Sequence, residues 1–404
     1  MLTFDEALAR ILAASQPLPS VEAPLGSALG CVLAEEIVSP HDLPPFDNSA
    51  MDGYALRAAD AASASESTPA VLPIDGEAVT GQPRRALAPG CAMRIFTGAV
   101  LPGGADAVVP VEDAREEGDH VALLSAPKAG DFLREAGEDL SRGEQALAAG
   151  TLLRPYEIGV AAAAGRASVR VHRAPKVAVL ATGSELVELG RPLAPGQIYD
   201  SNAPAIAAQV RAAGGEVSAM LRAADTREAL SDALAQAAAS GADLIVSSGG
   251  VSVGGYDYVK ECLADAGGAI DFWRVAIRPG KPFLLGRIGG ALFMGLPGNP
   301  VSSLVCFELF ARPALRRLAG FSVADAPRPI HRAVLAADAE HELGRRSFQR
   351  ARIEYRGAQT YAAPLTGQGS HRLRTLALSD ALVILPEDAP RVHAGETVDV
   401  ILLD

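Results

Sequence analysis

The spacing of apolar positions changes along the chain and divides it into regions. Near the N-terminus, apolar residues recur at helical spacing over 3–14, and Thr3 followed by Glu6 is a capping-box pattern. Residues 26–39 read as either a helix or a strand. From about 55 to 146, Gly and Pro separate short β-branched runs at 70–74, 107–111 and 120–124, which predict a small β domain.

From residue 175 onward, runs suited to strands alternate with runs suited to helices. This alternation predicts an α/β domain with a mainly parallel sheet. After Pro327 the chain again contains short strand-like runs between Gly and Pro, which predict a C-terminal β domain. Strands are predicted at 176–181, 216–221, 243–247, 272–277, 282–288, 291–295, 353–355, 382–385 and 398–403, and helices at 202–213, 226–239, 256–266 and 300–318.

Composition narrows the class of protein. A length of 404 residues exceeds what one hydrophobic core usually supports, and 49% hydrophobic with 21% charged residues is typical of globular chains. The net charge of -12 argues against a broad nucleic-acid surface, although a small anion needs only a few local cations. The four cysteines lack CxxC spacing and read as buried apolar residues. No signal peptide or membrane span is recognisable, so we expect a cytoplasmic protein.

The chemically unusual residues of the α/β region follow its predicted strands. Ligands of open α/β sheets bind outside the carboxyl ends of the strands. After strand 243–247 comes a Gly-rich segment, 247–255, whose N–H groups can approach phosphate oxygens just before a helix begins. This segment is neither a Walker A motif nor a dinucleotide-binding GxGxxG motif. We therefore predict one crevice for a phosphorylated ligand.

Charged residues at the same predicted edge suit that ligand. Asp225 and Asp257 open helices and could hold Mg²⁺ against a pyrophosphate, and Arg278 and Lys281 add positive charge. Simpler readings stay open. Asp225 and Asp257 could each be only a helix-start residue favoured by the helix dipole, and Glu185 only an acid in the first turn of a helix. Lys281 could be a surface lysine in a turn. The turn after strand 291–295 adds Pro297, Asn299 and Pro300.

Five segments of the chain resemble the motifs of the molybdopterin molybdenumtransferase (MoeA) family. That family includes the E domain of gephyrin and of the plant molybdenum insertase. The similarity covers almost the whole chain in the correct order. The segments are PPFDNSAMDGY (44–54), RIFTGAVLPGGADA (94–107), ATGSEL (181–186), SSGGVSVGGYDYVK (247–260) and LPGNPVS (296–302).

The resemblance implies an elongated homodimer of four-domain chains. The inserted β domain of one subunit would then cover the crevice of the other. The implied domains are a split small domain (27–45 and 147–175), the inserted β domain (46–146), a molybdopterin-binding α/β domain (1–26 and 176–326) and a C-terminal β domain (327–404).

The resemblance also implies a reaction: Mg²⁺-dependent insertion of molybdate into molybdopterin-AMP with release of AMP, the last general step of molybdenum cofactor synthesis. Transient contacts with the adenylyltransferase and with molybdoenzyme apoproteins would accompany it. Asp225 and Asp257 are the candidate metal ligands. The residues matching catalytic positions are Asp52, Thr97, Glu185, Asp225 and Asp257, and the expected substrate-binding residues are Ser247, Gly249, Gly250, Ser252, Arg278, Lys281, Pro297, Asn299, Pro300, Ser302, Arg350 and Ser370.

Departures and alternatives remain. Arg274 and Arg278 stand where some family members carry lysine, and Gly255 where an acid is common. The same α/β module occurs in molybdopterin adenylyltransferases and in a nucleotide pyrophosphatase or deamidase family, but PPFDNSAMDGY and the C-terminal region argue against these. A gephyrin-like scaffold is disfavoured because the sequence contains no fused adenylyltransferase domain. Preference for molybdenum over tungsten stays open.

Overall fold

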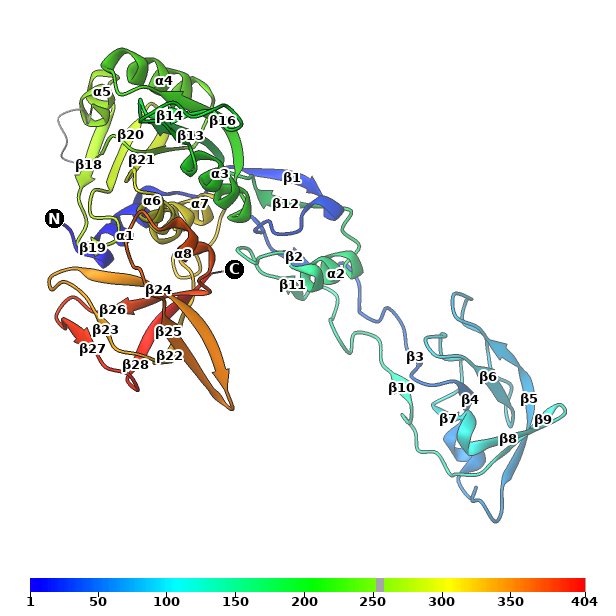
Figure 1. Cartoon of the computed structure of the whole chain (residues 1–404). Helices are drawn as coiled ribbons and strands as arrows, with labels where there is room; N and C mark the ends of the chain where they lie inside the picture. The colour runs from blue at the N-terminus through cyan, green and yellow to red at the C-terminus, as the bar shows by residue number, and fades with distance from the viewer. Residues whose placement is uncertain (252–257, 404) are drawn as a thin grey trace. The chain divides into compact units, whose positions relative to one another are not determined.

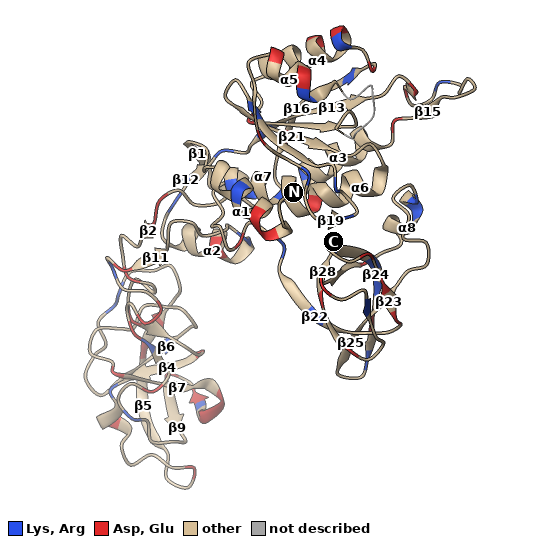
Figure 2. Cartoon of the chain, turned by 90° about the vertical axis from the view of Figure 1, so that its left-hand side faces the viewer, with Lys and Arg blue, Asp and Glu red and all other residues tan. Residues whose placement is uncertain are grey.

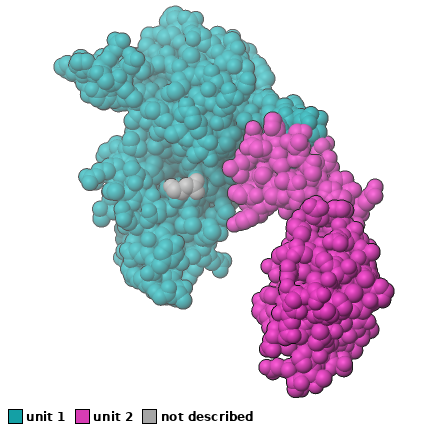
Figure 3. Space-filling view, turned by 90° about the vertical axis from the view of Figure 1, so that its right-hand side faces the viewer, with its two compact units in different colours: residues 1–23, 30–34, 170–404 teal, residues 24–29, 35–169 magenta. Residues whose placement is uncertain are grey.

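The computed structural model describes residues 1–251 and 258–403 and separates into two compact units. Unit 1 comprises residues 1–23, 30–34 and 170–404, and unit 2 comprises 24–29 and 35–169 (Figure 3). Nearly all of the net negative charge belongs to unit 2. Among the described residues, no helix combines the length and apolar character needed to cross a bilayer.

Unit 2 is built around one six-stranded sheet with an apolar core on each face. The predicted β runs of this region are confirmed. Gly53, in the PPFDNSAMDGY segment, lies where any Cβ would overlap the Val109 carbonyl, which explains a glycine there. The strands, in sheet order, are β7 (Ala107–Pro110), β4 (Gly53–Leu56), β6 (Ala92–Ile95), β5 (Ala70–Ala78), β9 (His120–Leu123) and β8 (Ala114–Glu117).

A smaller part of unit 2 lies outside that sheet. Here β2 (Ile37–Val38) pairs antiparallel with β11 (Gln145–Leu147), followed in sequence by α2 (Pro155–Ala163). Residues 26–39, predicted as a helix or a strand, form only a 3-10 turn at Leu25–Ser27 and the short β2. Isolated bridges and turns fix the rest of that stretch.

Unit 1 contains the predicted α/β domain, and its sheet is mainly parallel as expected. The strands from β16 to β21 run parallel, whereas β20 and β18 pair antiparallel. The sheet order is β16 (Glu216–Ala223), β13 (Lys176–Thr182), β17 (Leu244–Ser248), β21 (Ala291–Leu296), β20 (Leu284–Ile288) and β18 (Ala269–Trp273) (Figure 1).

Successive side chains of β13 point to opposite faces of this sheet, and both faces are buried. Val177 and Val179 pack into one core, and Ala178 and Leu180 into the other. The first core includes α1 (Phe4–Ala14), α3 (Asn202–Ala212), α6 (Pro300–Cys306) and α7 (Arg312–Leu318), and the second includes α4 (Arg227–Ala239) and α5 (Val259–Asp265). The capping box that Thr3 and Glu6 predict at α1 is confirmed.

Two predicted elements differ in the structure. The strand expected at 272–277 is interrupted, because Arg274 adopts a left-handed conformation with φ 74°. After this interruption, β19 (Ile277–Arg278) joins a different sheet. The helix expected at 300–318 is continuous but includes a π-helical segment at Phe307–Ala311 between α6 and α7.

The C-terminal region of unit 1 is a small β-barrel. Strand β26 pairs with both β24 and β28, and this closes the ring that runs through β25 and β22. Strand β19 adds to β24 in parallel. The strands are β22 (Ile330–Leu335), β24 (Arg346–Arg356), β25 (Gln359–Pro364), β26 (Ala381–Leu385) and β28 (Thr397–Leu402), and α8 (Leu373–Ala377) precedes β26.

Candidate active site

The turns that follow the parallel strands lie side by side, as the sequence predicts. The Gly249 N–H donates to the Leu296 carbonyl (3.1 Å), which joins the end of β17 to that of β21. The Gly183 N–H likewise donates to the Ala223 carbonyl (3.1 Å) at the ends of β13 and β16. One edge of the sheet therefore collects the glycine-containing turns.

Backbone packing between these turns requires glycine at Gly249. Its φ is 97°, and a Cβ at this position would lie 2.6 Å from Thr182 Oγ1 and 2.7 Å from the Thr182 carbonyl oxygen. A Cβ at Gly298 would in turn lie 3.6 Å from Gly249 Cα. The turns after β13 and β17 thus approach more closely than a side chain at Gly249 would allow, whereas the turn after β21 lies in ordinary van der Waals contact with Gly249.

Asp225 connects two of the turns and does not cap a helix. Its Oδ2 accepts from the Ser184 N–H (3.1 Å), and its own N–H donates to Ser184 Oγ (2.9 Å). The cap of α4 is instead Thr226, whose Oγ1 accepts from the Ala229 N–H. The carboxylate of Asp225 is therefore not used by α4, which weakens the reading of this residue as a helix-start acid.

Glu185 lies in the turn after β13, and its side chain is exposed. No helix begins there, because β14 (Leu186–Val187) follows directly, so the reading of Glu185 as a first-turn helix acid is wrong. Its carboxylate oxygens lie 2.8 and 2.9 Å from where a Gly183 Cβ would be. Gly183 therefore leaves the space that the Glu185 carboxylate fills.

Asn202 is a site residue that the sequence reasoning missed. Its Nδ2 donates to Ser248 Oγ (2.7 Å) and to the Gly298 carbonyl (2.8 Å), so one side chain joins α3 to the ends of β17 and β21. The bond to a carbonyl fixes which atom is the amide nitrogen. Its Oδ1 is buried and has no partner among the described residues. Asp200, two residues earlier, accepts from the Asn202 N–H and could have signalled this cluster.

Replacing Asn202 by alanine should loosen the two turns that its side chain joins. Loss of two hydrogen bonds, of which the one to Ser248 is partly buried, predicts destabilisation by about 1–3 kcal/mol, measured by urea unfolding. Asn202→Asp should be at least as disruptive, because a carboxylate cannot donate to the Gly298 carbonyl. Equal stability of wild type and both variants would contradict this role.

Helix α6 joins the strand-end turns to the C-terminal barrel. The helix begins at Pro300 after Asn299, and its Val301 N–H donates to the Ser370 carbonyl (3.0 Å). Ser302 is buried in the first turn of this helix. Pro297, Asn299, Pro300, Ser302 and Ser370, all predicted from sequence, therefore meet around the N-terminus of α6.

Arg350 holds the loop that ends at Ser370. Its side chain is only 1% exposed, and Nη2 donates to the carbonyls of Gly367 (2.9 Å) and Gly369 (3.3 Å). Burial lowers the pKa of Arg350, and its Nε has no partner in the part of the chain that the structure describes. No described carboxylate pairs with this buried guanidinium. A buried cation without a counter-ion is suited to an anionic ligand.

Arg278 and Lys281 lie next to α6, but they do not follow a strand of the α/β sheet as the sequence predicts. Arg278 does not follow a strand of the α/β sheet, because β19 pairs with β24 of the barrel. Between the two cations, Gly280 packs against Cys306 at the end of α6, where any Cβ would overlap Sγ. Both cations are exposed, and they help Arg345, the main cause, to hold the pKa of Glu342 below its usual range.

Asp52 and Thr97 form a pair of their own within unit 2. The Thr97 N–H and Oγ1 both donate to Asp52 Oδ1 at 2.7 Å. These two bonds, the backbone bond first, hold the pKa of Asp52 below its ordinary value. The structure thus brings together two residues that lie far apart in sequence and that the resemblance assigned to catalysis.

Thr97→Val should raise the pKa of Asp52 without returning it to the ordinary value, because the backbone N–H bond remains. A carboxyl whose pKa is depressed by folding stabilises the protein above its unfolded pKa, and this contribution is lost as the pH falls through the folded pKa. The variant should therefore lose less stability on acidification. Carboxyl ¹³C NMR titration measures the shift, and an unchanged Asp52 pKa would contradict the Thr97 contribution.

The remaining predicted residues are placed as follows. Ser247 is fully buried in β17, with Oγ unpartnered among the described residues, whereas Gly250 follows Gly249 with φ 67°. Ser252 and Asp257 lie outside the described residues. Within residues 1–251 and 258–403, no three His, Cys, Asp or Glu side chains group as a metal site would require.

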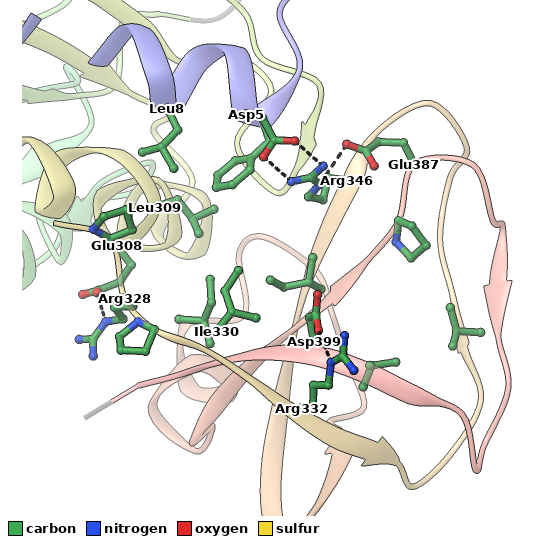
Figure 4. Close-up of a pocket in the computed structure, with 18 of the residues that line it drawn as sticks. Asp5, Leu8, Glu308, Leu309, Arg328, Ile330, Arg332, Arg346, Glu387 and Asp399 are labelled. Carbon is green, nitrogen blue, oxygen red and sulfur yellow. Dashed lines mark hydrogen bonds and ion pairs between the residues drawn. The ribbon is translucent and has the colours of Figure 1, made fainter. Parts of the chain in front are cut away.

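A large groove of about 1040 Å³ lies elsewhere in unit 1, between α1, the π-helical segment and the barrel (Figure 4). None of the predicted site residues lines it. Two of its arginines pair with carboxylates that also line it: Arg346 with Asp5 (2.8 Å) and Arg328 with Glu308 (2.8 Å). The larger cavity is therefore not where the chemically distinctive residues meet.

Comparison with family profiles matches three successive stretches of the chain. Residues 2–165 match the MoeA N-terminal region (domain I and II), residues 178–317 a probable molybdopterin binding domain, and residues 332–403 the MoeA C-terminal region (domain IV). Together these profiles cover most of the sequence.

Individual proteins match along almost the whole chain. Molybdopterin molybdenumtransferase 2 of Mycobacterium tuberculosis (strain ATCC 25618 / H37Rv) is 41% identical over 97% of this chain and 96% of its own length. Molybdopterin molybdenumtransferase of Nostoc sp. is 40% identical over 94% of this chain and 88% of its own. The molybdopterin biosynthesis MoeA protein of Pyrococcus horikoshii OT3 has a similar structure, with TM-score 0.84, 31% identity and 100% of both chains covered.

Proposed function

This chain belongs to the MoeA family of molybdopterin molybdenumtransferases, and we propose that it inserts molybdate into adenylylated molybdopterin and releases AMP. The observation that carries this proposal is the α6 junction, by which we mean the first turn of α6 together with the turn at 296–299 before it and the Ser370 loop beside it. There, the glycine turns after β17 and β21 meet the Ser370 loop that the buried Arg350 holds. A phosphorylated pterin and a tetrahedral oxyanion need sites of these two kinds next to each other.

The strand-end turns would bind the nucleotide part of the substrate. The Leu296 carbonyl already accepts from the Gly249 N–H, so we expect the N–H of Gly250, the next residue at this sheet edge, to contribute instead. Backbone N–H groups in such turns bind phosphate oxygens in open α/β folds. Asp225 and Glu185 stand at the same edge with carboxylates that α4 does not use. We propose that these residues orient the pyrophosphate for cleavage and AMP release.

Molybdate would bind at the other side of the α6 junction. Arg350 provides a buried positive charge, and Ser302 and Ser370 lie around the first turn of α6. Arg278 and Lys281 add exposed positive charge, and Gly280, which lies between them in sequence, packs against Cys306 of α6. Arginine can contact two oxygens of an oxyanion at once.

The donor set at the sheet edge fits Mg²⁺ held partly by substrate. Proteins commonly bind this ion through one or two carboxylates together with phosphate oxygens. Asp225 Oδ1 makes no hydrogen bond within the described residues, which suits this role, and Asp257 is the second proposed ligand. When bound, Mg²⁺ would supply charge neutralisation and polarisation of the pyrophosphate.

We also propose that the protein functions as a homodimer of four-domain chains, with the domain boundaries predicted from sequence. The separation of the six-stranded sheet of unit 2 from the β2–β11 pair supports two domains there. Asp52 and Thr97 belong to unit 2, whereas the other proposed catalytic residues belong to unit 1. A second subunit would allow unit 2 to complete the partner's crevice.

Incubation with molybdopterin-AMP, with and without molybdate, tests the proposed function. We expect AMP release that depends on molybdate and a pterin product that activates a molybdoenzyme apoprotein. Equal AMP release without molybdate would indicate a nucleotide pyrophosphatase instead. No release under either condition would favour a scaffold. An adenylyltransferase is disfavoured because the family profiles extend over both regions that flank the α/β domain.

A further inference from the structure

We propose that a cationic pocket beside the Ser370 loop, formed by His371, Arg372 and Arg374, captures tetrahedral oxyanions for the neighbouring reaction site. The pocket has a volume of about 840 Å³ and is lined by residues 365–366, 371–375 and 378. It is distinct from the groove beside α1, with which it shares no lining residue. This proposal rests on the proposed function.

Every residue of this pocket that carries a formal charge at pH 7 is an arginine. Its lining contains two arginines and a histidine but no Asp or Glu, although the protein carries a net charge of -12. In Figure 2 the ribbon at α8 is partly blue. Several arginines elsewhere, Arg173 and Arg227 among them, pair with carboxylates. Within the described residues, Arg372 and Arg374 make no ion pair and are exposed.

The pocket and Arg350 share the same loop. Arg372 lies against Gly367, where a Cβ would be 2.6 Å from Nη1, and His371 lies against Gly369, where a Cβ would be 2.9 Å from Cε1. The carbonyls of both glycines accept from Arg350 Nη2. The backbone at 367–369 therefore has the exposed Arg372 and His371 side chains packed against it and also accepts hydrogen bonds from the buried Arg350.

This arrangement favours small, multiply charged anions. Cations without counter-ions in a concave surface raise the local concentration of an anion and the rate at which it binds. The guanidinium groups match a tetrahedral oxyanion because each can donate to two of its oxygens. Molybdate and the phosphate of the nucleotide substrate share this chemistry. We infer that either ion reaches the α6 junction by way of this pocket.

Equilibrium dialysis tests the pocket directly, with molybdate, inorganic phosphate and AMP as separate arms. The variant is Arg372→Gln/Arg374→Gln. Its control is Arg191→Gln/Arg356→Gln, which removes the same charge at exposed arginines outside the pocket. We expect about tenfold weaker binding in the variant and wild-type binding in the control. Loss in the molybdate arm identifies molybdate as the ligand, and loss only in the phosphate and AMP arms identifies the nucleotide phosphate.

Steady-state AMP release provides a second readout. The variant should show about tenfold higher KM for the captured anion, unchanged kcat and a weaker dependence on salt. Arg372→Lys/Arg374→Lys, which keeps the charge, should recover most of the loss. Unchanged binding in all three arms, an equal loss in the control, or a fall in kcat alone would overturn the proposal. If wild type binds anions in the pocket but releases no AMP, only the proposed function fails.

Discussion

Asp225→Asn is expected to lower molybdate-dependent AMP release by about 10²–10³-fold, the cost of removing one strong electrostatic contact in an active site. Asparagine keeps the shape of the side chain and can still accept from the Ser184 N–H. The turns should therefore stay in place while the negative charge is lost. Single-turnover AMP release and the unfolding midpoint together separate a loss of chemistry from a loss of fold.

Asp232→Asn is the matched control for this change. Asp232 lies exposed on α4, so its replacement removes the same charge from the same domain without touching the strand-end turns. We expect wild-type activity in this variant. Near-wild-type AMP release by Asp225→Asn, or an equal loss in both variants, would remove Asp225 from the reaction.

Gly280→Ala is expected to destabilise the protein by about 2–5 kcal/mol, combining overpacking with left-handed backbone strain. Gly280 has φ 113°, and an added Cβ would overlap Cys306 Sγ on α6. The same clash should displace Arg278 and Lys281 from the α6 junction and weaken molybdate binding. Urea unfolding and molybdate dialysis measure the two effects.

The Gly280 and Cys306 pair allows the two causes to be separated. In a Gly280→Ala/Cys306→Ala double variant the overlap with Sγ disappears, so part of the stability should return, whereas the close contact with Ile277 and the backbone strain remain. Gly290→Ala is the control, because no atom lies within 4 Å of its added Cβ and its φ is not positive. If the loss of unfolding free energy in the double variant equals the sum of the losses in the two single variants, the contact between the added Cβ and Cys306 Sγ is not the cause of the destabilisation.

Local patterns predicted much of the fold because they act within a few residues. The capping box at Thr3 and the continuous apolar run that predicts the buried strand β13 are both patterns of neighbouring residues. The rule that strand ends collect ligand-binding turns then placed Gly249 and Asp225 at one edge. The structure bears out that convergence through the Ser184 and Leu296 hydrogen bonds.

Features set by tertiary structure were beyond the sequence pattern. Arg274 adopts a left-handed conformation, and β19 leaves the α/β region for the barrel, a change that no local propensity signals. Asn202 reads as an ordinary helix-start residue, and its importance comes from contacts 46 and 96 residues away. The buried state of Arg350 likewise depends on a loop 17–19 residues farther along the chain.

Anomalous diffraction from crystals soaked with molybdate tests the α6 junction most directly. The predicted result is a molybdenum peak next to the Arg350 side chain, the Ser370 loop and the first turn of α6. A peak confined to the groove lined by Arg346 and Arg328, from a preparation that releases AMP with molybdate, would contradict the proposed site.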